Sequence, residues 1–398
     1  MANKKKILEL LSRRVEEVIV RDHLERDLLK SAPLRVKLGM DPSALDIHLG
    51  HTVVLRKLRE FQELGHTVVF IIGDFTAMIG DPSGRSKTRP QLDPSTIEKN
   101  AQTYFNQAGK VLDIKKCEVH YNSEWFNKWD ARELIMHRAK FSLKRILERD
   151  DFEKRMKDKT AEIFAHETDY PMLQAYDSVA IRASVEIGGT DQKFNMLTGR
   201  DLQRKLGMPE QDVMTCPLLI GLDGAQKMSK SLGNYIGITE APAEMYGKLM
   251  SLQDSLIIQY FRLLTDMPVK EIDVFEKKLQ GGINPRDVKA RLAREIVKMY
   301  HGAAAAQKAE EAFVQTFQRH EVPEEVQELR IRNHKLGIVD LLVQTKFAVS
   351  KSEARRVVEQ GGIKVDGKVV DDSSAVITLT KQGVLVQKGK RHFVRVSL

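Results

Sequence analysis

Hydrophobic and polar positions near the start of the chain predict a strand–helix–strand unit. Residues 34–40 alternate between apolar and polar side chains, and residues 50–64 carry apolar side chains at helical spacing. Residues 67–72 are rich in β-branched side chains and have no polar face, which indicates a strand buried on both sides of a parallel sheet. Parallel sheets bind ligands beyond the carboxyl ends of their strands. The loops 41–51 and 73–89, which leave these strands, are therefore predicted to form one site.

The middle of the chain is predicted to be a long insertion into this sheet. Ser95 and Glu98 have the spacing of a capping box and predict a helix start. A mostly helical, charged stretch follows to about Tyr176, and it is too long for a plain crossover, so we expect a subdomain or a partner interface. Strands are predicted to resume at residues 185–187 and 215–220.

The last third of the chain changes character twice. The pattern is wholly helical after residue 239, whereas the final residues predict two short helices and a hairpin with an Asp366-Gly367 turn. The fold class expected is α/β, with a doubly wound parallel-sheet (Rossmann-type) domain, a helical domain and a small α+β domain. The predicted boundaries are 1–238, 239–332 and 333–398.

Length and composition agree with several domains and a reducing compartment. A chain of 398 residues is too long for one ordinary domain. Its longest apolar stretch, residues 68–73, is far shorter than the roughly 20 residues that span a bilayer. The charged residues after Lys6 do not resemble a leader peptide. The only cysteines, Cys117 and Cys216, exclude a disulfide framework and a cysteine-built zinc site, so we expect a cytoplasmic protein.

Positive charge is concentrated in the C-terminal module. The formal net charge is +9, and residues 333–398 hold 12 Lys or Arg against 6 Asp or Glu. A basic module on a nearly neutral body predicts a polyanionic partner such as nucleic acid. A merely soluble basic surface is the alternative.

The histidine motif His48-Leu49-Gly50-His51 lies where the first strand leads into the helix. Two imidazoles three residues apart face the same way, beside the N-terminal amides and dipole of the helix. Gly50 lets a ligand approach the backbone closely, so this motif suits a polyphosphate. Two other interpretations stay open, a metal pair without an evident third ligand and a packing role.

The lysine motif Lys227-Met228-Ser229-Lys230-Ser231 lies in a loop flanked by glycines. Two ammonium groups on a hinged segment can close over phosphates and stabilise a departing pyrophosphate. A solvated charged loop is the alternative. The order and spacing of the histidine and lysine motifs, both after strands of one parallel sheet, make the phosphate interpretation more specific than either motif alone.

The two motifs together resemble the class I aminoacyl-tRNA synthetases, and nearly the whole chain is similar to the bacterial tyrosyl-tRNA synthetases that carry Lys-Met-Ser-Lys-Ser. The resemblance extends to residues 121–125, 174–178 and 188–192. It implies activation of L-tyrosine by ATP with Mg²⁺, transfer to tRNA(Tyr), and a homodimer without protein-bound zinc or membrane attachment. It implies catalytic roles for His48, His51, Lys227 and Lys230. It also implies an ATP site formed by Asp41, Ser43, His48, Gly50, His51, Asp191, Lys227, Met228 and Lys230.

Tyr170, Gln174 and Asp177 are spaced so that they fall on one stripe of a helix. A carboxylate that accepts a hydrogen bond from a phenol in an apolar pocket separates tyrosine from phenylalanine. The resemblance implies that Asp177 receives the substrate hydroxyl. It implies a tyrosine site formed by Asp81, Tyr170, Gln174, Asp177 and Gln192. Lys37 is a departure, because another branch of the family has a tyrosine there.

The basic module resembles a small RNA-binding domain shared with a ribosomal protein of the small subunit. Structured RNA is bound mostly through phosphates, shape and 2′-hydroxyls. We therefore expect a tRNA-binding face formed by Lys351, Arg355, Arg356, Lys364 and Lys368. Two rival functions remain: a tryptophanyl-tRNA synthetase, which shares both motifs, and a non-catalytic RNA-binding protein on the same scaffold.

Overall fold

A computed structural model describes most of the chain. The described residues are 4–30, 32–41, 46–81, 93–318, 326–331, 334–380, 383–389 and 392–398. They fall into two compact units, which are Met1–Glu240 with Ser251–Leu292, and Ala241–Met250 with Ala293–Leu398. The three-domain division drawn from the sequence stays a prediction.

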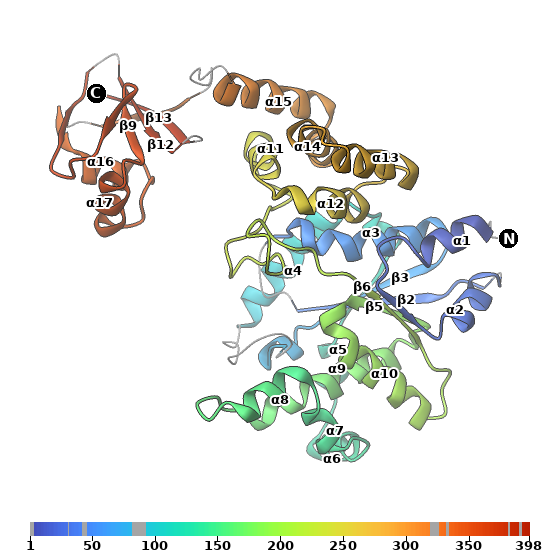
Figure 1. The fold of residues 1–398 in the computed structure, drawn as a ribbon. Coiled ribbons are helices and arrows are strands. Elements are labelled where there is room, and N and C mark those ends of the chain that lie inside the picture. Colours follow the sequence, from blue (N-terminus) through green and yellow to red (C-terminus); the bar gives the residue numbers. More distant parts are fainter. Residues whose placement is uncertain are drawn as a thin grey trace. The chain divides into compact units, whose positions relative to one another are not determined.

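The first unit is built on a six-stranded sheet (Figure 1). In spatial order its strands are β1 (Glu17–Ile19), β6 (Asp212–Cys216), β5 (Val185–Gly189), β2 (Arg35–Met40), β3 (Thr67–Ile72) and β4 (Glu118–Tyr121). All neighbouring pairs are parallel except β1 with β6. The chain runs from β2 through β3 to β4 on one side and returns to β5 and β6 on the other. Strand order therefore reverses between β2 and β5, and the predicted doubly wound α/β fold is confirmed.

Strands β2 and β3 match their predictions, and five of the six residues of β3 are buried, as expected. The outer strands β1 and β4 were not predicted, because edge strands carry exposed polar residues that break the apolar pattern. One predicted strand had the wrong bounds. Strand β6 covers Asp212–Cys216 rather than residues 215–220. Its polar first residue is buried, and Pro217, just after its end, cannot donate to a ladder.

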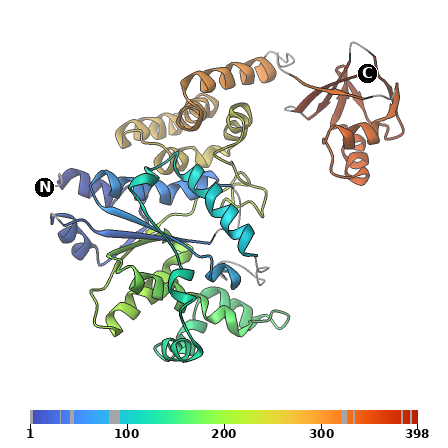
Figure 2. The ribbon, with the colours of Figure 1, turned by 180° about the vertical axis from the view of Figure 1, so that it is seen from behind.

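Helices cover both faces of this sheet (Figure 2). One face carries α1 (Lys4–Leu10), α3 (Leu49–Glu63) and α12 (Ile257–Leu264), and α12 is followed by α13 (Val269–Gln280). The other face carries α9 (Tyr170–Ala180) and α10 (Lys193–Lys205), while α2 (Arg21–Leu28) contacts β6. The predicted helix after β2 is confirmed: Val53, Leu58 and Phe61 of α3 are buried, and Gly65 follows its end with a φ of +88°.

The insertion is mostly helical, as predicted, although it also contains β4. Its helices before α9 are α4 (Pro94–Ala108), α5 (Ser123–Phe126), α6 (Ala131–Arg138), α7 (Leu143–Leu147) and α8 (Asp150–Lys157). The predicted capping box of Ser95 with Glu98 was wrong. Asp93 is the N-cap residue, and its carboxylate accepts a hydrogen bond from the backbone N–H of Thr96 at 3.0 Å. Pro94 is well suited to the first helical position, so the helix begins two residues earlier than predicted.

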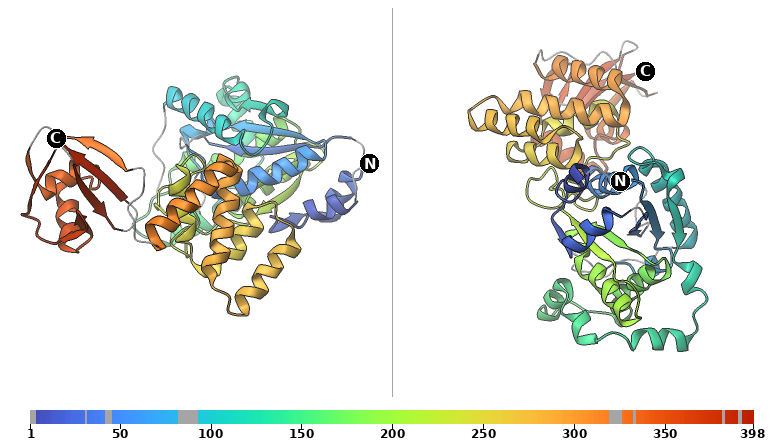
Figure 3. Two further views of the ribbon diagram at one scale, coloured as in Figure 1. Left: turned by 90° about the horizontal axis from the view of Figure 1, so that it is seen from above. Right: turned by 90° about the vertical axis from the view of Figure 1, so that its right-hand side faces the viewer.

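The second unit combines helices with a small α+β module (Figure 3). Its helices are α11 (Pro242–Met250), α15 (Ala303–Gln318), the end of α14 (Pro285–His301), α16 (Ile338–Gln344) and α17 (Lys351–Glu359). One sheet has the order β10 (Lys368–Val370), β9 (Ile363–Val365), β12 (Val384–Lys388), β13 (His392–Ser397) and β7 (Gln327–Arg330), and β11 (Val376–Thr378) pairs with β8 (Lys335–Gly337).

The predicted hairpin of this module is confirmed. Strands β9 and β10 are antiparallel, and Asp366 and Gly367 both have positive φ, as a two-residue primed turn requires. Strand β7 is a correction, because its residues were predicted to be helical. Its parallel pairing with the distant β13 stabilises an extended conformation that the local pattern does not reveal.

Candidate active site

Four parallel strands deliver polar side chains to their carboxyl edge. Asp41 follows β2, Thr76 lies in the turn after β3, and Asp191 follows β5. Thr76 Oγ1 donates to Asp41 Oδ1 at 3.0 Å, close to the backbone of Gly73. A Cβ at Gly73 would lie 2.1 Å from the same carboxylate oxygen, so glycine is required for this approach. Asn122, which follows β4, was missed by the sequence analysis together with its strand.

The histidine and lysine motifs lie together at this edge. Backbone hydrogen bonds join the two segments, from Leu49 N–H to Ile236 O at 2.9 Å and from Ile238 N–H to Ile47 O at 3.0 Å. Lys230 Nζ lies 2.9 Å from Asp46 Oδ2, just before the histidine motif. The predicted convergence of the two motifs is therefore what the structure shows.

His48 begins α3 in an environment that keeps its imidazole neutral. The ring is buried, and burial, followed by the proximity of His51 and Lys230, lowers the pKa of His48 to about 2. Its Nδ1 has no hydrogen-bond partner within the described part of the chain. A Cβ at Gly50 would lie 3.0 Å from this ring, so glycine gives the imidazole its room.

The two imidazoles are held as a pair. Their ring centroids are 3.8 Å apart, and the backbone N–H of His48 donates to His51 Nδ1 at 3.3 Å. Because Nδ1 of His51 accepts this hydrogen bond, a neutral His51 carries its proton on Nε2, which becomes a donor. The pair therefore offers neutral N–H donors beside a helix N-terminus, an arrangement that suits phosphate oxygens.

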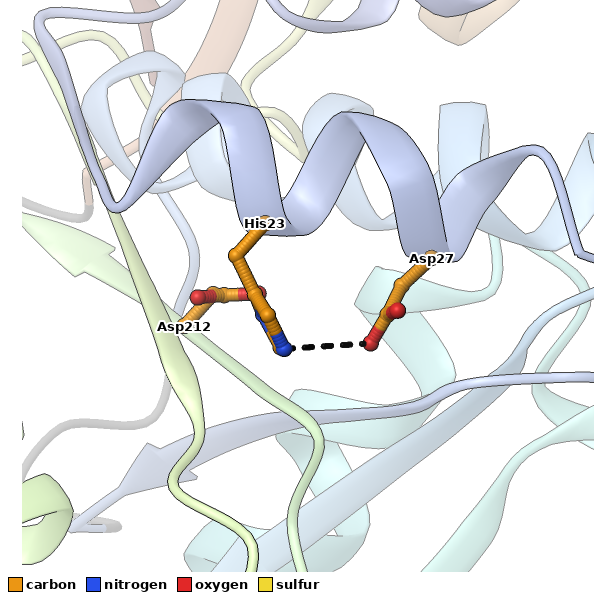
Figure 4. Close-up of side chains that lie close together, drawn as sticks. All are labelled: His23, Asp27 and Asp212. Atoms are coloured by element: carbon orange, nitrogen blue, oxygen red, sulfur yellow. Dashed lines mark hydrogen bonds and ion pairs between the residues drawn. The ribbon is translucent and has the colours of Figure 1, made fainter.

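Within the described ranges, no third His, Cys, Asp or Glu forms a ligand group with these two histidines. The described residues contain one group of three side chains that could hold a metal ion, formed by His23, Asp27 and Asp212 (Figure 4). This group joins α2 to the amino end of β6, at the opposite edge of the sheet from the histidine motif. His23 Nδ1 lies 2.8 Å from Asp212 Oδ2, and Arg200 lies 3.5 Å from the other oxygen of that carboxylate. The local ion pairs account for the group.

The lysine loop is cross-linked internally by the side chain of Asn234, a residue that the sequence analysis missed. Asn234 is buried; its amide nitrogen donates to Asp223 Oδ2 at 2.7 Å and to Lys227 O at 3.1 Å, while its oxygen accepts from Ser229 N–H at 2.8 Å. A Cβ at Gly221 would lie 2.3 Å from this amide. Asparagine following a Lys-Ser-Leu-Gly segment is an ordinary loop residue in sequence, so only the fold reveals this role.

Lys227 of the lysine motif contacts the turn after β5. Its Nζ lies 2.6 Å from Asp191 Oδ2, in the turn that follows β5. Met228 is buried, and its Cβ is 3.5 Å from the position of a Cβ on Gly50. Contacts therefore join the histidine motif, the lysine motif and Asp191 of the predicted ATP site, and Asp41 follows β2 at the same edge of the sheet. Ser43 falls outside the described residues.

Each of the three residues of the stripe predicted for α9 makes a hydrogen bond with a different partner, and the partners of Tyr170 and Gln174 come first. Tyr170 donates its hydroxyl to Asp41 Oδ2 at 2.9 Å, and Gln174 Nε2 donates to Glu186 Oε1 at 3.2 Å. The other two residues of the predicted tyrosine site are bonded to each other, since Gln192 Nε2 donates to Asp81 Oδ2 at 2.7 Å. The remaining residues of the loop after Asp81, up to residue 92, fall outside the described part of the chain.

Asp177 is the last residue of this stripe along α9, and its side chain is buried. It is 3% exposed, and its Oδ1 accepts from the indole N–H of Trp125 at 3.0 Å, with Asn122 Nδ2 at 3.5 Å from Oδ2. Burial raises the pKa of Asp177 to about 7, opposed by Lys37 and the two donors and reinforced by Glu186. The side chain is thus a buried acceptor with capacity left on Oδ2.

The proposed RNA-binding residues are all exposed, although they do not share one face. Arg355 and Arg356 lie on the outer side of α17, and Lys351 pairs with Asp340 at 2.8 Å. The hairpin register pairs Lys364 with Val369 and Lys368 with Val365. Because successive strand residues alternate between faces, Lys364 and Lys368 point to opposite sides, which corrects the single face that we expected.

Two family models match the chain and define its class. The model of tRNA synthetases class I (W and Y) matches residues 29–318, and that of the tyrosine–tRNA ligase SYY-like C-terminal domain matches residues 318–396. The chain accordingly belongs to the class I tRNA synthetases of the tryptophan and tyrosine group.

Curated relatives narrow this class. The tyrosine–tRNA ligase of Moorella thermoacetica is 51% identical over 394 residues, covering 98% of this chain and 95% of the relative. That of Thermotoga maritima is 51% identical over 391 residues, covering 98% and 97%. The chain therefore belongs to the tyrosine–tRNA ligase family, which confirms the resemblance drawn from its two motifs.

A solved structure agrees with the fold. The tyrosyl-tRNA synthetase from Archaeoglobus fulgidus complexed with L-tyrosine has a TM-score of 0.62 and 22% identity, covering 77% of this chain and all of that chain, 100%. None of the helices in the described ranges has the length and apolar composition needed to cross a membrane.

Proposed function

We propose that this site joins L-tyrosine to tRNA(Tyr) in two steps. An oxygen of the tyrosine carboxylate attacks the α-phosphorus of ATP, and the bond to the β-phosphate breaks, which gives tyrosyl-adenylate and pyrophosphate. A ribose hydroxyl of the tRNA then attacks the adenylate's carbonyl carbon and releases AMP. The chain is a tyrosine–tRNA ligase, and class I synthetases use ATP.

The observation that carries this proposal is the backbone pairing of residues 47–49 with residues 236–238, which brings the two motifs to one edge of the sheet. No general base is needed for activation, because the attacking carboxylate is already ionised. The protein then contributes by positioning the reactants and by stabilising the charge that develops on phosphate oxygens. Neutral N–H donors and two ammonium groups in one place suit that task.

We assign the ATP phosphates to the two motifs. His48 and His51 would donate to phosphate oxygens, while Lys227 and Lys230 would exchange Asp191 and Asp46 for the departing pyrophosphate. Both carboxylates belong to partly exposed ion pairs, and breaking such a pair requires little free energy. The other ATP contacts proposed are Asp41, Ser43, Gly50, Asp191 and Met228. A magnesium ion would accompany the phosphates, and no residue is assigned to zinc.

The tyrosine pocket is assigned to the α9 stripe. Asp177 would accept the phenol hydroxyl through Oδ2, because Trp125 already donates to Oδ1. Tyr170, Gln174, Asp81 and Gln192 would surround the substrate's ammonium and carboxylate groups. A phenylalanine would leave the buried carboxylate without its partner, and that penalty favours tyrosine.

The test of this function is ATP–pyrophosphate exchange with each of the twenty amino acids. We expect exchange with tyrosine alone. Exchange with tryptophan instead would identify a tryptophanyl-tRNA synthetase. Absence of exchange with every amino acid, in a protein that still binds tRNA, would identify a non-catalytic RNA-binding protein.

We assign tRNA contacts to Lys351, Arg355, Arg356, Lys364 and Lys368, and a homodimer interface to the insertion. Ile135, Met136, Leu143 and Met156 are large apolar side chains that the insertion helices expose, and exposed apolar side chains of this kind can form an interface. Sedimentation that finds only monomer at micromolar concentration would refute the dimer. Cytoplasmic localisation is proposed with it, since Cys117 and Cys216 are both free thiols.

A further inference from the structure

A buried ion pair lies beside the proposed tyrosine site. Lys37 and Glu186 are directly opposite each other on β2 and β5, where the strand order reverses. Their charged groups are 2.9 Å apart, and the side chains are 0% and 2% exposed. Removing two charges from water is costly, and apolar side chains of similar volume often stabilise a core at least as well. The pair therefore calls for a role other than stability.

Every donor of Lys37 is used. Its ammonium group has three protons, and three acceptors surround it: Glu186, Ser178 Oγ at 2.8 Å and the backbone carbonyl of Gln174 at 3.0 Å. Two of these acceptors belong to α9, the helix that carries the proposed tyrosine-binding stripe. Lys37 thus ties the backbone of that helix to the centre of the sheet.

Glu186 uses both of its oxygens. Oε1 accepts from Lys37 and from Gln174 Nε2 at 3.2 Å, while Oε2 accepts from Ser178 Oγ at 3.1 Å and from Gln211 Nε2 at 2.5 Å. An ionised carboxylate is an acceptor only, so the side-chain amide of Gln174 must turn its nitrogen toward Glu186. The amide oxygen of Gln174 is then the end that remains for a ligand.

We propose that the Lys37–Glu186 pair is a positioning pair of the tyrosine site, which fixes the Gln174 amide with its oxygen directed at the substrate's ammonium group. This rests on the proposed function, in which Gln174 lies beside that ammonium. Neither member of the pair touches the substrate in this arrangement. Lys37 thereby gains a role where another branch of the family carries a tyrosine.

Lys37 and Glu186 carry opposite charges, so together they fix the Gln174 amide without adding net charge to the pocket. An unpaired Lys37 would repel the substrate's ammonium, and an unpaired Glu186 would repel the carboxylate of Asp177. Lys37 lowers and Glu186 raises the pKa of Asp177, which is consistent with a balanced pair beside that group. A neutral amide in place of Glu186 can donate as well as accept, so it would let the Gln174 amide rotate.

The experiment compares two tyrosine analogues as competitors in ATP–pyrophosphate exchange. Tyramine has the ammonium group but no carboxylate, and 3-(4-hydroxyphenyl)propanoate has the carboxylate but no ammonium group. We expect Glu186→Gln to weaken tyramine about ten- to hundredfold, the range of a hydrogen bond to a charged group, and to change the propanoate less than about twofold. The charge-balanced double variant Lys37→Met/Glu186→Gln should show the same selective loss, and it preserves the test if Glu186→Gln alone does not fold.

Gln174→Met is the reference variant. We expect it to weaken tyramine selectively, and we expect the charge-balanced double variant Lys37→Met/Glu186→Gln to add no further loss in that background. Unchanged tyramine binding in Gln174→Met would mean that the proposed role of Gln174 has failed. Suppose that Gln174→Met weakens tyramine selectively, as expected. The positioning role is then overturned if the Glu186 variants bind tyramine normally, or if they lose tyramine and propanoate binding equally.

Discussion

Lys230 Nζ lies 2.9 Å from Asp46 Oδ2, so the lysine motif is bonded to the residue two positions before the histidine motif. The pair is partly exposed, with 26% of the Lys230 side chain and 49% of the Asp46 side chain accessible to solvent. Ion pairs of this kind contribute about 0–1 kcal/mol. Lys230 can therefore leave the carboxylate for a phosphate at little cost.

We predict that Lys230→Ala slows adenylate formation by about a hundred- to a thousandfold, the usual effect of losing one charge-stabilising group. The dissociation constant of tyrosine should change less than about twofold, because Lys230 does not line the α9 stripe. Single-turnover kinetics and equilibrium dialysis measure the two quantities. Asp46→Asn is the matched control, with an expected effect of a few-fold. A comparable loss of tyrosine binding in Lys230→Ala would contradict this role.

The pocket's response to pH follows from Asp177. Its pKa of about 7 means that the carboxyl becomes ionised as pH rises through neutrality. The ionised form is the stronger acceptor for a phenol hydroxyl. We therefore predict that the preference for tyrosine over phenylalanine in exchange assays increases between pH 6 and pH 8. Asp177→Asn should flatten this profile. The groups that face Asp177 are Lys37, Glu186, Trp125 and Asn122.

Asp177 affects the stability of the fold in the opposite direction: as pH rises, the preference for tyrosine increases but the contribution of Asp177 to stability decreases. A carboxyl whose pKa is raised on folding, from about 3.9 to about 7, stabilises the fold at low pH and loses that contribution as pH rises toward 7. The unsubstituted protein loses this contribution as pH rises, whereas Asp177→Asn does not. We predict that the unfolding free energy of the variant minus that of the unsubstituted protein increases by about 1 kcal/mol per pH unit between pH 5 and pH 7. Denaturant titrations at each pH measure this difference, and a constant difference would refute the assigned pKa.

The lysine loop depends on Asn234. We predict that Asn234→Ala lowers the rate of adenylate formation at least about tenfold, because three hydrogen bonds that shape the loop are lost. The fold should lose about 1–3 kcal/mol of stability. Asn234→Asp keeps the acceptor for Ser229 N–H but places a carboxylate oxygen against Asp223 Oδ2, so we expect it not to recover the rate. An unchanged rate in Asn234→Ala would show that the loop reaches its working geometry without this residue.

The basic module should act on tRNA and leave activation alone. We predict that Arg355→Glu raises the KM for tRNA several-fold, more strongly at low than at high salt, while ATP–pyrophosphate exchange stays unchanged. Lys335→Glu makes the same charge change on another exposed residue of the module and is the control. Equal effects of both variants would indicate a diffuse charge effect rather than a local contact.

Local patterns predicted the elements whose signals do not depend on partners. The run at residues 67–72 is a buried strand because β-branched side chains pack on both faces of a sheet. The Asp366-Gly367 turn formed because both residues tolerate positive φ. The short edge strands β1 and β4 had no such signal, and Asn122 was lost from the candidate site together with β4.

The sequence by itself determined the chemistry of the site, because two short motifs and a helical stripe place histidines, lysines and a carboxylate at spacings that few other proteins share. The tertiary structure decided the pairings: Lys230 with Asp46, Trp125 with Asp177, and Lys37 with Glu186. The physical reason is distance along the chain. Hydrogen bonds between residues 52, 149 or 184 positions apart depend on how the strands are ordered, and no local pattern encodes that order.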